Sequence, residues 1–209
     1  MRTKPLLGAH VSAAGGLYVV PGRADALGAE AVQVFGASPR QWKVRLPNAE
    51  EIRQYRTALF SSRVRVVFLH AAYLVNLATP DKTLWKKSVE NLSLHFEIAQ
   101  LMGAEGLILH IGSSGPKDRQ SAFKMVAEGI REVFRLVPGK VKLIMENSSG
   151  GGGKVGSSIE DLTQIFKMVK SQRLGLCFDT AHAFEAGIIR YEPGTIRNFF
   201  DEWDKRIGL

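Results

Sequence analysis

Cysteine is almost absent from this chain of 209 residues, since Cys177 is the only one. A single cysteine cannot form an intramolecular disulfide, so we expect a reducing compartment and a cytoplasmic location. Long apolar runs are also lacking, because no stretch approaches the ~20 apolar residues that a helix needs to cross a bilayer. His10, Ser12 and the pair Gly15-Gly16 interrupt the amino-terminal apolar segment, which argues against a signal peptide. We therefore expect a soluble protein with no membrane partner.

Acidic residues are fewer than basic ones: the sequence has 20 aspartates and glutamates and 28 lysines and arginines, which gives a net charge of +8. An excess of positive charge favours an anionic partner such as nucleic acid, although a basic surface also serves solubility alone. The hydrophobic fraction of 45% is enough to bury one large core. The sequence has no linker, low-complexity segment or run of like charge, so residues 1–209 are expected to form a single domain.

Short apolar segments alternate with longer segments of helical periodicity along the chain. This alternation is typical of parallel α/β folds, in which each helix returns the chain to the same edge of the sheet. A TIM (β/α)8-type barrel of such units would need roughly 280 residues, so we expect a barrel truncated after about six units. Asn48 and Glu51 have the spacing of a capping box. Strands are predicted at residues 6–11, 31–35, 64–69, 106–109, 141–145 and 174–178, and helices at 17–27, 49–61, 84–102, 120–137, 159–170 and 195–207.

Four successive predicted strands run into a residue that can bind a metal ion. These residues are His70, His110, Glu146 and Asp179, and His182 follows three positions after the last of them. Since the carboxyl ends of parallel strands meet at one edge, these side chains should share one space. Imidazole nitrogens and carboxylate oxygens are ordinary ligands of zinc and its neighbours, so we predict a metal centre. Taken alone, Asp179 could equally be a turn residue or a helix N-cap.

A run of four glycines, residues 150–153, follows the fifth strand and is tested against two phosphate-binding motifs. The Walker A pattern fails, because Ser148 and Val155 occupy positions that require glycine and a hydroxyl residue. The dinucleotide pattern matches at Gly151, Gly153 and Gly156, with Asp179 about twenty residues further on. Glu146 at the strand end would repel a pyrophosphate, however, and a flexible loop is the simpler interpretation.

Two further segments suggest contacts with nucleic acid. Arg40, Gln41, Trp42 and Lys43 combine phosphate-binding groups with an aromatic ring in one long connection. Tyr73 and Leu74 follow a predicted ligand and could insert into a duplex. An ordinary packed loop is the alternative in both cases. Two histidines remain. His10 stands at the end of the first predicted strand, and we expect it to support the metal centre from a second shell. His95 lies within a predicted helix with no partner at ligand spacing, and we expect it to be structural or solvated.

Taken together, several stretches resemble the endonuclease IV family, the metal-dependent nucleases that act at apurinic or apyrimidinic (abasic) sites in base-excision repair. The matching stretches follow the order of the family over nearly the whole chain. Ile111-Gly112 replaces the usual Pro-Gly, and Ala71-Ala72 replaces residues that are commonly polar. The matches are residues 8–17 (GAHVSAAGGL), Arg40-Gln41-Trp42, His70 with residues 73–77 (YLVNL), His110 with Gly112-Ser113, Glu146-Asn147, and residues 179–184 (DTAHAF) with Ala186-Gly187.

The resemblance implies a DNA-repair endonuclease that hydrolyses the phosphodiester bond 5′ to an abasic site and leaves a 3′-hydroxyl. It implies a cluster of up to three metal ions, usually zinc with manganese possible, and Glu146 and Asp179 as its catalytic carboxylates. His70, His110 and Glu146 would hold the first ion, Glu146 and Asp179 the second, and His182 the third. Arg40, Gln41, Tyr73 and Leu74 correspond to residues that contact double-stranded DNA.

The resemblance also leaves alternatives open. The remaining ligands of the family, a His, an Asp-x-His pair and a Glu, would lie beyond Leu209. A chain without them could be a catalytically incomplete DNA-binding fragment, and its exposed sheet edges could favour self-association. A metal-dependent sugar isomerase or epimerase with the same barrel would also place carboxylates and histidines at strand ends. The basic charge and the segments at Arg40 and Tyr73 favour the nuclease over the isomerase.

Overall fold

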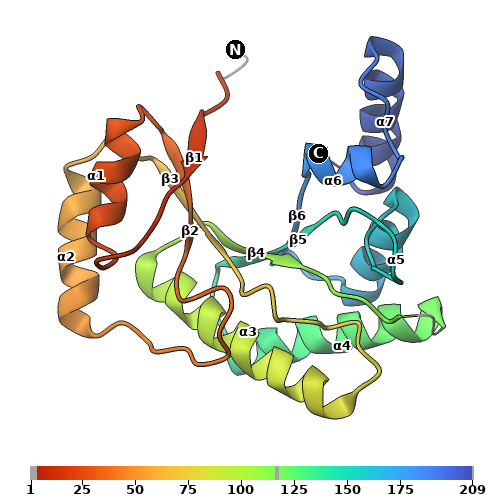
Figure 1. Cartoon of the computed structure of the whole chain (residues 1–209), viewed down its shortest axis with the longest axis horizontal. Coiled ribbons are helices and arrows are strands. Elements are labelled where there is room, and N and C mark those ends of the chain that lie inside the picture. Colours follow the sequence, from red (N-terminus) through yellow and green to blue (C-terminus); the bar gives the residue numbers. More distant parts are fainter. Residues whose placement is uncertain (1–3, 116–117, 209) are drawn as a thin grey trace.

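The computed structural model describes residues 4–115 and 118–208, and its central feature is a parallel sheet of six strands (Figure 1). Leu209, after which the sequence analysis expects the barrel to be cut, lies outside the described residues. The strands are β1 (Gly8–His10), β2 (Ala31–Phe35), β3 (Val66–His70), β4 (Gly106–His110), β5 (Lys142–Glu146) and β6 (Leu174–Cys177). The helices are α1 (Val19–Ala26), α2 (Ala49–Phe60), α3 (Lys82–Met102), α4 (Arg119–Leu136), α5 (Ile159–Val169), α6 (Thr180–Glu185) and α7 (Pro193–Arg206).

The sheet has the strand order of an open barrel. Each strand pairs in parallel with the next strand of the sequence, so all carboxyl ends lie at one edge. The sheet is curved, with α1 and α2 beside its first strands and α3 and α4 beneath its middle (Figure 1). The prediction of about six strand-helix units of a TIM barrel is therefore confirmed. In the described part of the chain β1 and β6 each pair on one side only, and self-association through these edges stays a prediction.

The core lies between the sheet and the helices, and it decides which way the strand-end residues point. Leu69, Leu109 and Met145 are fully buried and face the helices. Because successive side chains of a strand alternate between the two faces, the following residue of each strand points to the concave side. Burial of one such apolar side chain contributes roughly 1.5–3 kcal/mol, so the core fixes the orientation of the neighbouring polar residue. Within the described residues, no helix is long and apolar enough to cross a membrane.

The predicted elements are present, with ends that differ by a few residues. β1 is only three residues long, shorter than predicted, because an edge strand is held by β2 alone. His70, His110 and Glu146 are the last residues of their strands, whereas the sequence analysis placed them one position beyond the strand ends. For the short helix α6 no range was predicted, and the sequence left open whether Asp179 begins a helix or a turn, since six residues are too few to show helical periodicity.

The helix ends agree with their local sequence. Asn48 and Glu51 form the expected capping box at the start of α2. Gly103 ends α3 in the left-handed conformation that glycine adopts at little cost. Lys170 ends α5 in the same conformation, with φ of 49°, and is the only non-glycine residue with positive φ among those the structure describes.

The conformation of Lys170 leads to a stability prediction. A left-handed conformation costs a side-chain-bearing residue about 1–2 kcal/mol, part of which glycine loses again through its greater freedom in the unfolded chain. We expect Lys170→Gly to raise the free energy of unfolding by roughly 0.5–1 kcal/mol, measured by urea denaturation. Lys167→Gly, in the last turn of the same helix, is the matched control and should lower it by about 1 kcal/mol. Equal effects of the two substitutions would contradict this assignment.

Candidate metal centre

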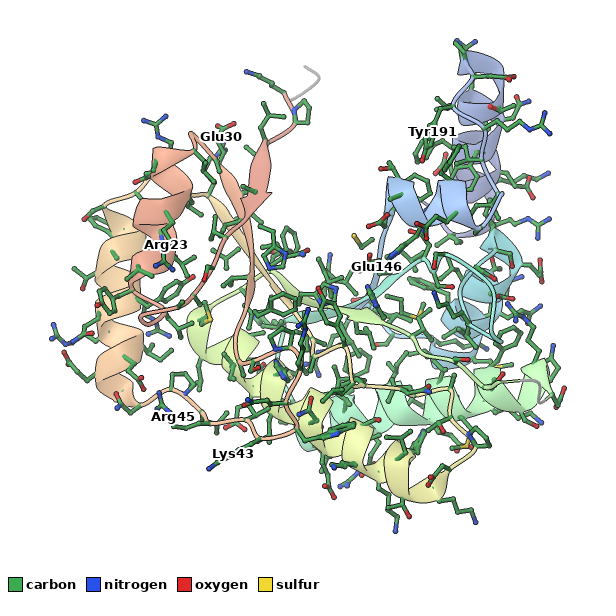
Figure 2. All side chains as sticks on the ribbon, in the orientation of Figure 1. Arg23, Glu30, Lys43, Arg45, Glu146 and Tyr191 are labelled. Atoms are coloured by element: carbon green, nitrogen blue, oxygen red, sulfur yellow. The ribbon has the colours of Figure 1, made fainter. Side chains whose placement is uncertain are left out.

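Five predicted ligand residues converge at the carboxyl edge of the sheet. His70, His110 and Glu146 end β3, β4 and β5, and the register pairs His110 directly with Glu146. Asp179 follows β6, and His182 lies in the first turn of α6. In Figure 2, Glu146 lies in the middle of the molecule, between the amino-terminal units and the helices α6 and α7.

Glu146 is the centre of this cluster and is only 6% exposed. Its Oε2 atom lies 3.2 Å from His70 Nε2 and 3.4 Å from His110 Nε2, and its Oε1 atom lies 3.2 Å from His182 Nδ1. Burial favours the neutral acid, but the hydrogen bonds and charges of His110 and His70 outweigh it and hold the pKa below its ordinary value. Glu146 is therefore a buried carboxylate that, in the described part of the chain, has only histidines as ion-pair partners.

The orientation of His70 limits what can lie between it and Glu146. His70 Nδ1 is 2.8 Å from the carbonyl oxygen of Ala71, which can only accept, so Nδ1 carries a proton. A neutral imidazole then presents the lone pair of Nε2 toward the carboxylate oxygen at 3.2 Å. Two lone pairs at this distance require a proton or a metal cation between them. A histidine that donates its other ring nitrogen to a carbonyl is the usual arrangement of a metal ligand.

Asp179 and His182 are held in place by Asn147, which is 1% exposed. Asn147 Nδ2 donates to the carbonyl oxygen of Asp179, and the Asp179 amide donates to Asn147 Oδ1 at 2.6 Å. The carbonyl oxygen of Asn147 lies 2.9 Å from His182 Nδ1. Asp179 also caps α6, because its Oδ1 accepts from the His182 amide at 2.8 Å. The alternative reading of Asp179 as an N-cap is thus confirmed, while Oδ2 takes no part in the cap.

The donor atoms fall into two groups that share Glu146. The ligand atoms of His70, His110 and Glu146 lie within 4.8 Å of one another, and so do those of Glu146, Asp179 and His182. Imidazole nitrogen and carboxylate oxygen together suit zinc, and also manganese. The donor set and the buried negative charge of Glu146 therefore fit divalent cations.

His10 lies beside these groups and belongs to neither of them. Its Nδ1 atom is 3.0 Å from Gln33 Nε2, and its ring packs on Phe35 at 4.8 Å. Phe35 in turn contacts His70 at 5.3 Å. Burial, and then the charge of His70, lower the pKa of His10. The ring of Phe35 thus lies between His10 and the cluster.

Side chains that the sequence analysis did not single out join the connections around the cluster. Asn76 Nδ2 donates to the carbonyl oxygen of Ser113, and Asn76 Oδ1 accepts from the Ser113 amide. Ser113 Oγ donates to the carbonyl oxygen of Gly152 at 2.6 Å. Asn76, Ser113 and Asn147 therefore connect the segments that follow β3, β4, β5 and β6. Each of them lies in a stretch that matches the family and within six residues after a predicted ligand, but none was identified as a site residue.

Two of the four predicted DNA-binding residues, Tyr73 and Leu74, border the cluster. Arg40 and Gln41 are exposed, Tyr73 is 51% exposed and Leu74 is half-buried. The Tyr73 amide donates to the carbonyl oxygen of Pro39 at 3.0 Å, which joins the two connections that carry these residues. The Tyr73 ring lies 5.7 Å from each of the rings of His70 and His110. One wall above the ligand cluster is therefore aromatic.

Three other residues considered in the sequence analysis, Trp42, His95 and Cys177, pack within the fold. Lys87 Nζ lies 4.5 Å from the centre of the Trp42 ring, and Asn91 Nδ2 donates to the Trp42 carbonyl, so this part of the connection packs on α3. His95 is fully buried, which lowers its pKa to about 4 together with the charge of His70 and supports the structural reading. Burial, then Glu146 and Asp179, raise the pKa of the Cys177 thiol to about 11, so it stays protonated.

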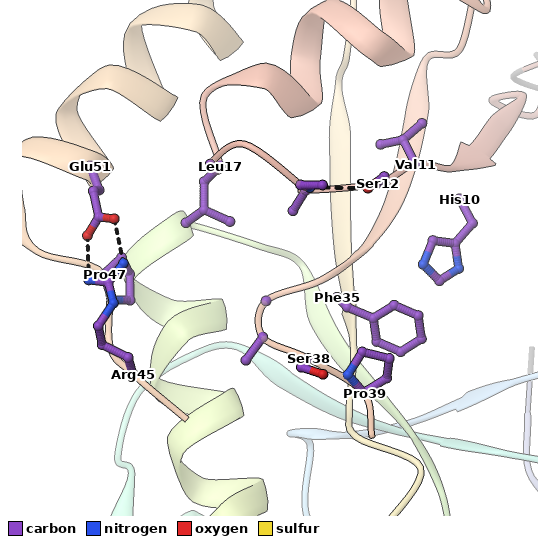
Figure 3. A pocket seen from close by; sticks show the side chains of 15 residues that line it. His10, Val11, Ser12, Leu17, Phe35, Ser38, Pro39, Arg45, Pro47 and Glu51 are labelled. Atoms are coloured by element: carbon purple, nitrogen blue, oxygen red, sulfur yellow. Dashed lines mark hydrogen bonds and ion pairs between the residues drawn. The ribbon is translucent and has the colours of Figure 1, made fainter. Parts of the chain in front are cut away.

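Two cavities open beside the cluster. One of about 690 Å³ lies between the segments that follow β1 and β2, with His10 and Phe35 on one side and the Arg45–Glu51 ion pair on the other (Figure 3). The other, of about 350 Å³, is lined by three residues of the cluster, His110, Glu146 and His182. It is lined by Tyr73, Leu74, Val75, Asn76, Leu84, His110, Ile111, Gly112, Ser113, Glu146, Asn147, Ser148, Ser149, Lys154 and His182.

Comparisons with known proteins agree with this architecture. The xylose isomerase-like TIM barrel family matches residues 22–209. A probable endonuclease 4 from Halothermothrix orenii is 37% identical over 205 residues, which cover 97% of this chain and 73% of that protein. The crystal structure of endonuclease IV from Thermus thermophilus superimposes with a TM-score of 0.84 at 34% identity, covering 98% of this chain and 73% of that one.

A similarity to sugar epimerases is limited to the fold. The 3-keto-D-glucoside 4-epimerase of E. coli superimposes with a TM-score of 0.71 over 98% of this chain and 77% of that one, at 11% identity. The similarity to the endonucleases extends to the sequence over nearly the whole chain. The chain belongs to the endonuclease IV family of xylose isomerase-like TIM barrels.

Proposed function

We propose that this chain is a metal-dependent DNA-repair endonuclease that hydrolyses the phosphodiester bond 5′ to an abasic site. The observation that carries the proposal is the buried carboxylate of Glu146, which faces three imidazoles and has no other ion-pair partner in the described chain. Such a donor set suits zinc, and the relatives with which the chain shares this fold are named endonucleases. We also propose a cytoplasmic location, in line with the single cysteine.

In this proposal the ligand residues hold divalent cations in two groups around Glu146. His70 and His110 complete the first group, and Asp179 and His182 complete the second. When bound, such ions supply Lewis-acid stabilisation of the negative charge that develops on the phosphate. Asn147 keeps Asp179 and His182 in position through its hydrogen bonds, which lowers the cost of assembling the second group.

The reaction adds one water molecule across one bond. A water oxygen bonds to phosphorus, the bond from phosphorus to the 3′ oxygen breaks, and that oxygen takes a proton and becomes a 3′-hydroxyl. Arg40 and Gln41 would contact phosphates, which supplies affinity without sequence preference. Tyr73 and Leu74 would occupy the space left by the missing base, since an abasic nucleotide has no stacking to lose.

The first prediction concerns the reaction itself. The purified 209-residue chain with added zinc should cut a duplex with one abasic site on the 5′ side of that site, and EDTA should abolish the cut. A polymerase should extend the product, because it carries a 3′-hydroxyl. Two other results are decisive. Binding to abasic duplex without any cut would identify a DNA-binding fragment, and conversion of ketose sugars without a cut would favour the epimerase alternative.

The second prediction concerns the metal ions. Because Glu146 belongs to both donor groups, Glu146→Gln should weaken zinc binding by roughly 100-fold or more, measured by competition with a zinc-binding dye. His10→Gln is the matched control, since His10 belongs to neither group, and it should leave the number of bound ions unchanged. A loss of one ion in the His10 variant would instead make His10 a ligand.

The third prediction concerns DNA affinity. Arg40→Ala should weaken binding to abasic duplexes of any sequence equally and reduce the salt dependence of binding by about one unit. Arg65→Ala is the control, because Arg65 is exposed at the opposite, amino-terminal end of β3. If both variants lose the same affinity, the effect reflects net charge, and the assignment of Arg40 to the DNA interface is wrong.

A further inference from the structure

Lys154 stands on the wall of the cavity that three residues of the ligand cluster line. Among the described residues that line this cavity it is the only lysine or arginine. His110, Glu146 and His182 line the same cavity, and so do Tyr73 and Leu74. We propose that Lys154 is a phosphate-binding residue that holds a phosphodiester next to the one at the ligand cluster. This inference rests on the proposed function, and it adds a contact outside the predicted DNA-binding residues.

The backbone around Lys154 is fixed from several sides. Four glycines in the left-handed conformation, residues 150–153, turn the chain back so that the Lys154 amide donates to the carbonyl oxygen of Gly151 at 2.9 Å. Lys154 also forms an antiparallel bridge with Ser113. The next residue, Val155, is fully buried and donates its amide to the carbonyl oxygen of Gly112. Backbone hydrogen bonds thus join the glycine-rich segment to the connection that follows β4.

A second set of contacts holds the segment from outside. Arg119 donates to the carbonyl oxygen of Lys154 at 3.4 Å and forms an ion pair with Asp161. Asp161 is 4% exposed and accepts from the amide of Gly156 at 3.0 Å. Gly153 packs so closely on Gly115 that a β-carbon there would lie 2.0 Å from a carbonyl oxygen. The backbone that carries Lys154 is therefore held by several contacts before any ligand binds, which reduces the cost of ordering it on binding.

The ammonium group of Lys154 has more hydrogen-bond donors than partners in the described chain. Nζ donates to Ser149 Oγ at 2.7 Å, and an ammonium carries three N–H groups. In the part of the chain that the structure describes, no carboxylate lies within ion-pair distance of this nitrogen. Two of its donors therefore have no partner in the described chain, and a phosphate offers several acceptor oxygens with a negative charge. Since Lys154 lines the same cavity as His110, Glu146 and His182, we assign to it a phosphate next to the one at the ligand cluster.

The test uses a duplex that binds but is not cut. In its abasic strand the bridging 3′ oxygen 5′ to the site is replaced by methylene, so the charge remains and the bond that would break is absent. Each neighbouring phosphate is then replaced in turn by a neutral methylphosphonate. Dissociation constants are measured with zinc for the unmodified chain and for Lys154→Ala, Lys154→Arg and Lys140→Ala. Lys140 is an exposed lysine at the opposite edge of the sheet and serves as the control.

For the unmodified chain, one methylphosphonate position should weaken binding roughly three- to fivefold, the size of a partly exposed ion pair. Lys154→Ala should weaken binding to the fully charged duplex by a similar factor and lose the sensitivity to that one position. Lys154→Arg should keep the sensitivity to that position, and Lys140→Ala should bind every duplex as the unmodified chain does. Thermal unfolding of each variant checks that it is folded.

Three results would overturn this inference or its basis. If Lys154→Ala keeps the sensitivity to every methylphosphonate position, Lys154 does not bind a phosphate. If Lys140→Ala loses as much affinity as Lys154→Ala, the contribution is one of net charge only. If the unmodified chain binds abasic and intact duplexes equally, the proposed function itself fails. The first two results concern Lys154 alone and do not affect the proposed function.

Discussion

The buried carboxylate of Glu146 is the constraint on which the rest of the site depends. A charge that is only 6% exposed is stable only if opposite charge or hydrogen-bond donors compensate for the lost water. Here the compensation comes from His70, His110 and His182, which belong to three other segments of the chain. The parallel register of β3, β4 and β5 and the position of α6 must therefore be correct together for this carboxylate to be buried.

The connections at the carboxyl edge are joined to one another as firmly as the strands below them. Asn76, Ser113 and Asn147 each take part in at least two hydrogen bonds between neighbouring connections. Such bonds fix the loops that carry ligands before any ion or substrate binds, which reduces the cost of assembling the site. The glycine-rich segment that carries Lys154 belongs to the same network through Ser113.

The sequence predicted the parts of the site that depend on the order of elements, and it missed those that depend on contacts between loops. His70, His110 and Glu146 were found because each is a polar residue at the end of an apolar strand, and parallel topology brings such ends together. Asn76, Ser113 and Asn147 lie in stretches that match the family, but their role in the site was missed, because asparagine and serine in a connection also fit an ordinary turn. The length of β1 was overestimated, since periodicity shows which residues can form a strand but not how many find a partner.

Asp179 shows why a local interpretation and a functional one need not compete. Sequence reasoning treated the N-cap and the metal ligand as alternatives, yet a carboxylate has two oxygens. Oδ1 accepts from the His182 amide at 2.8 Å and starts α6, while Oδ2 lies 3.9 Å from His182 Nδ1. The cap determines where the helix begins, and the start of the helix determines where the His182 ring lies relative to Glu146. The local hydrogen bond is therefore a condition for the donor group that Asp179, His182 and Glu146 form.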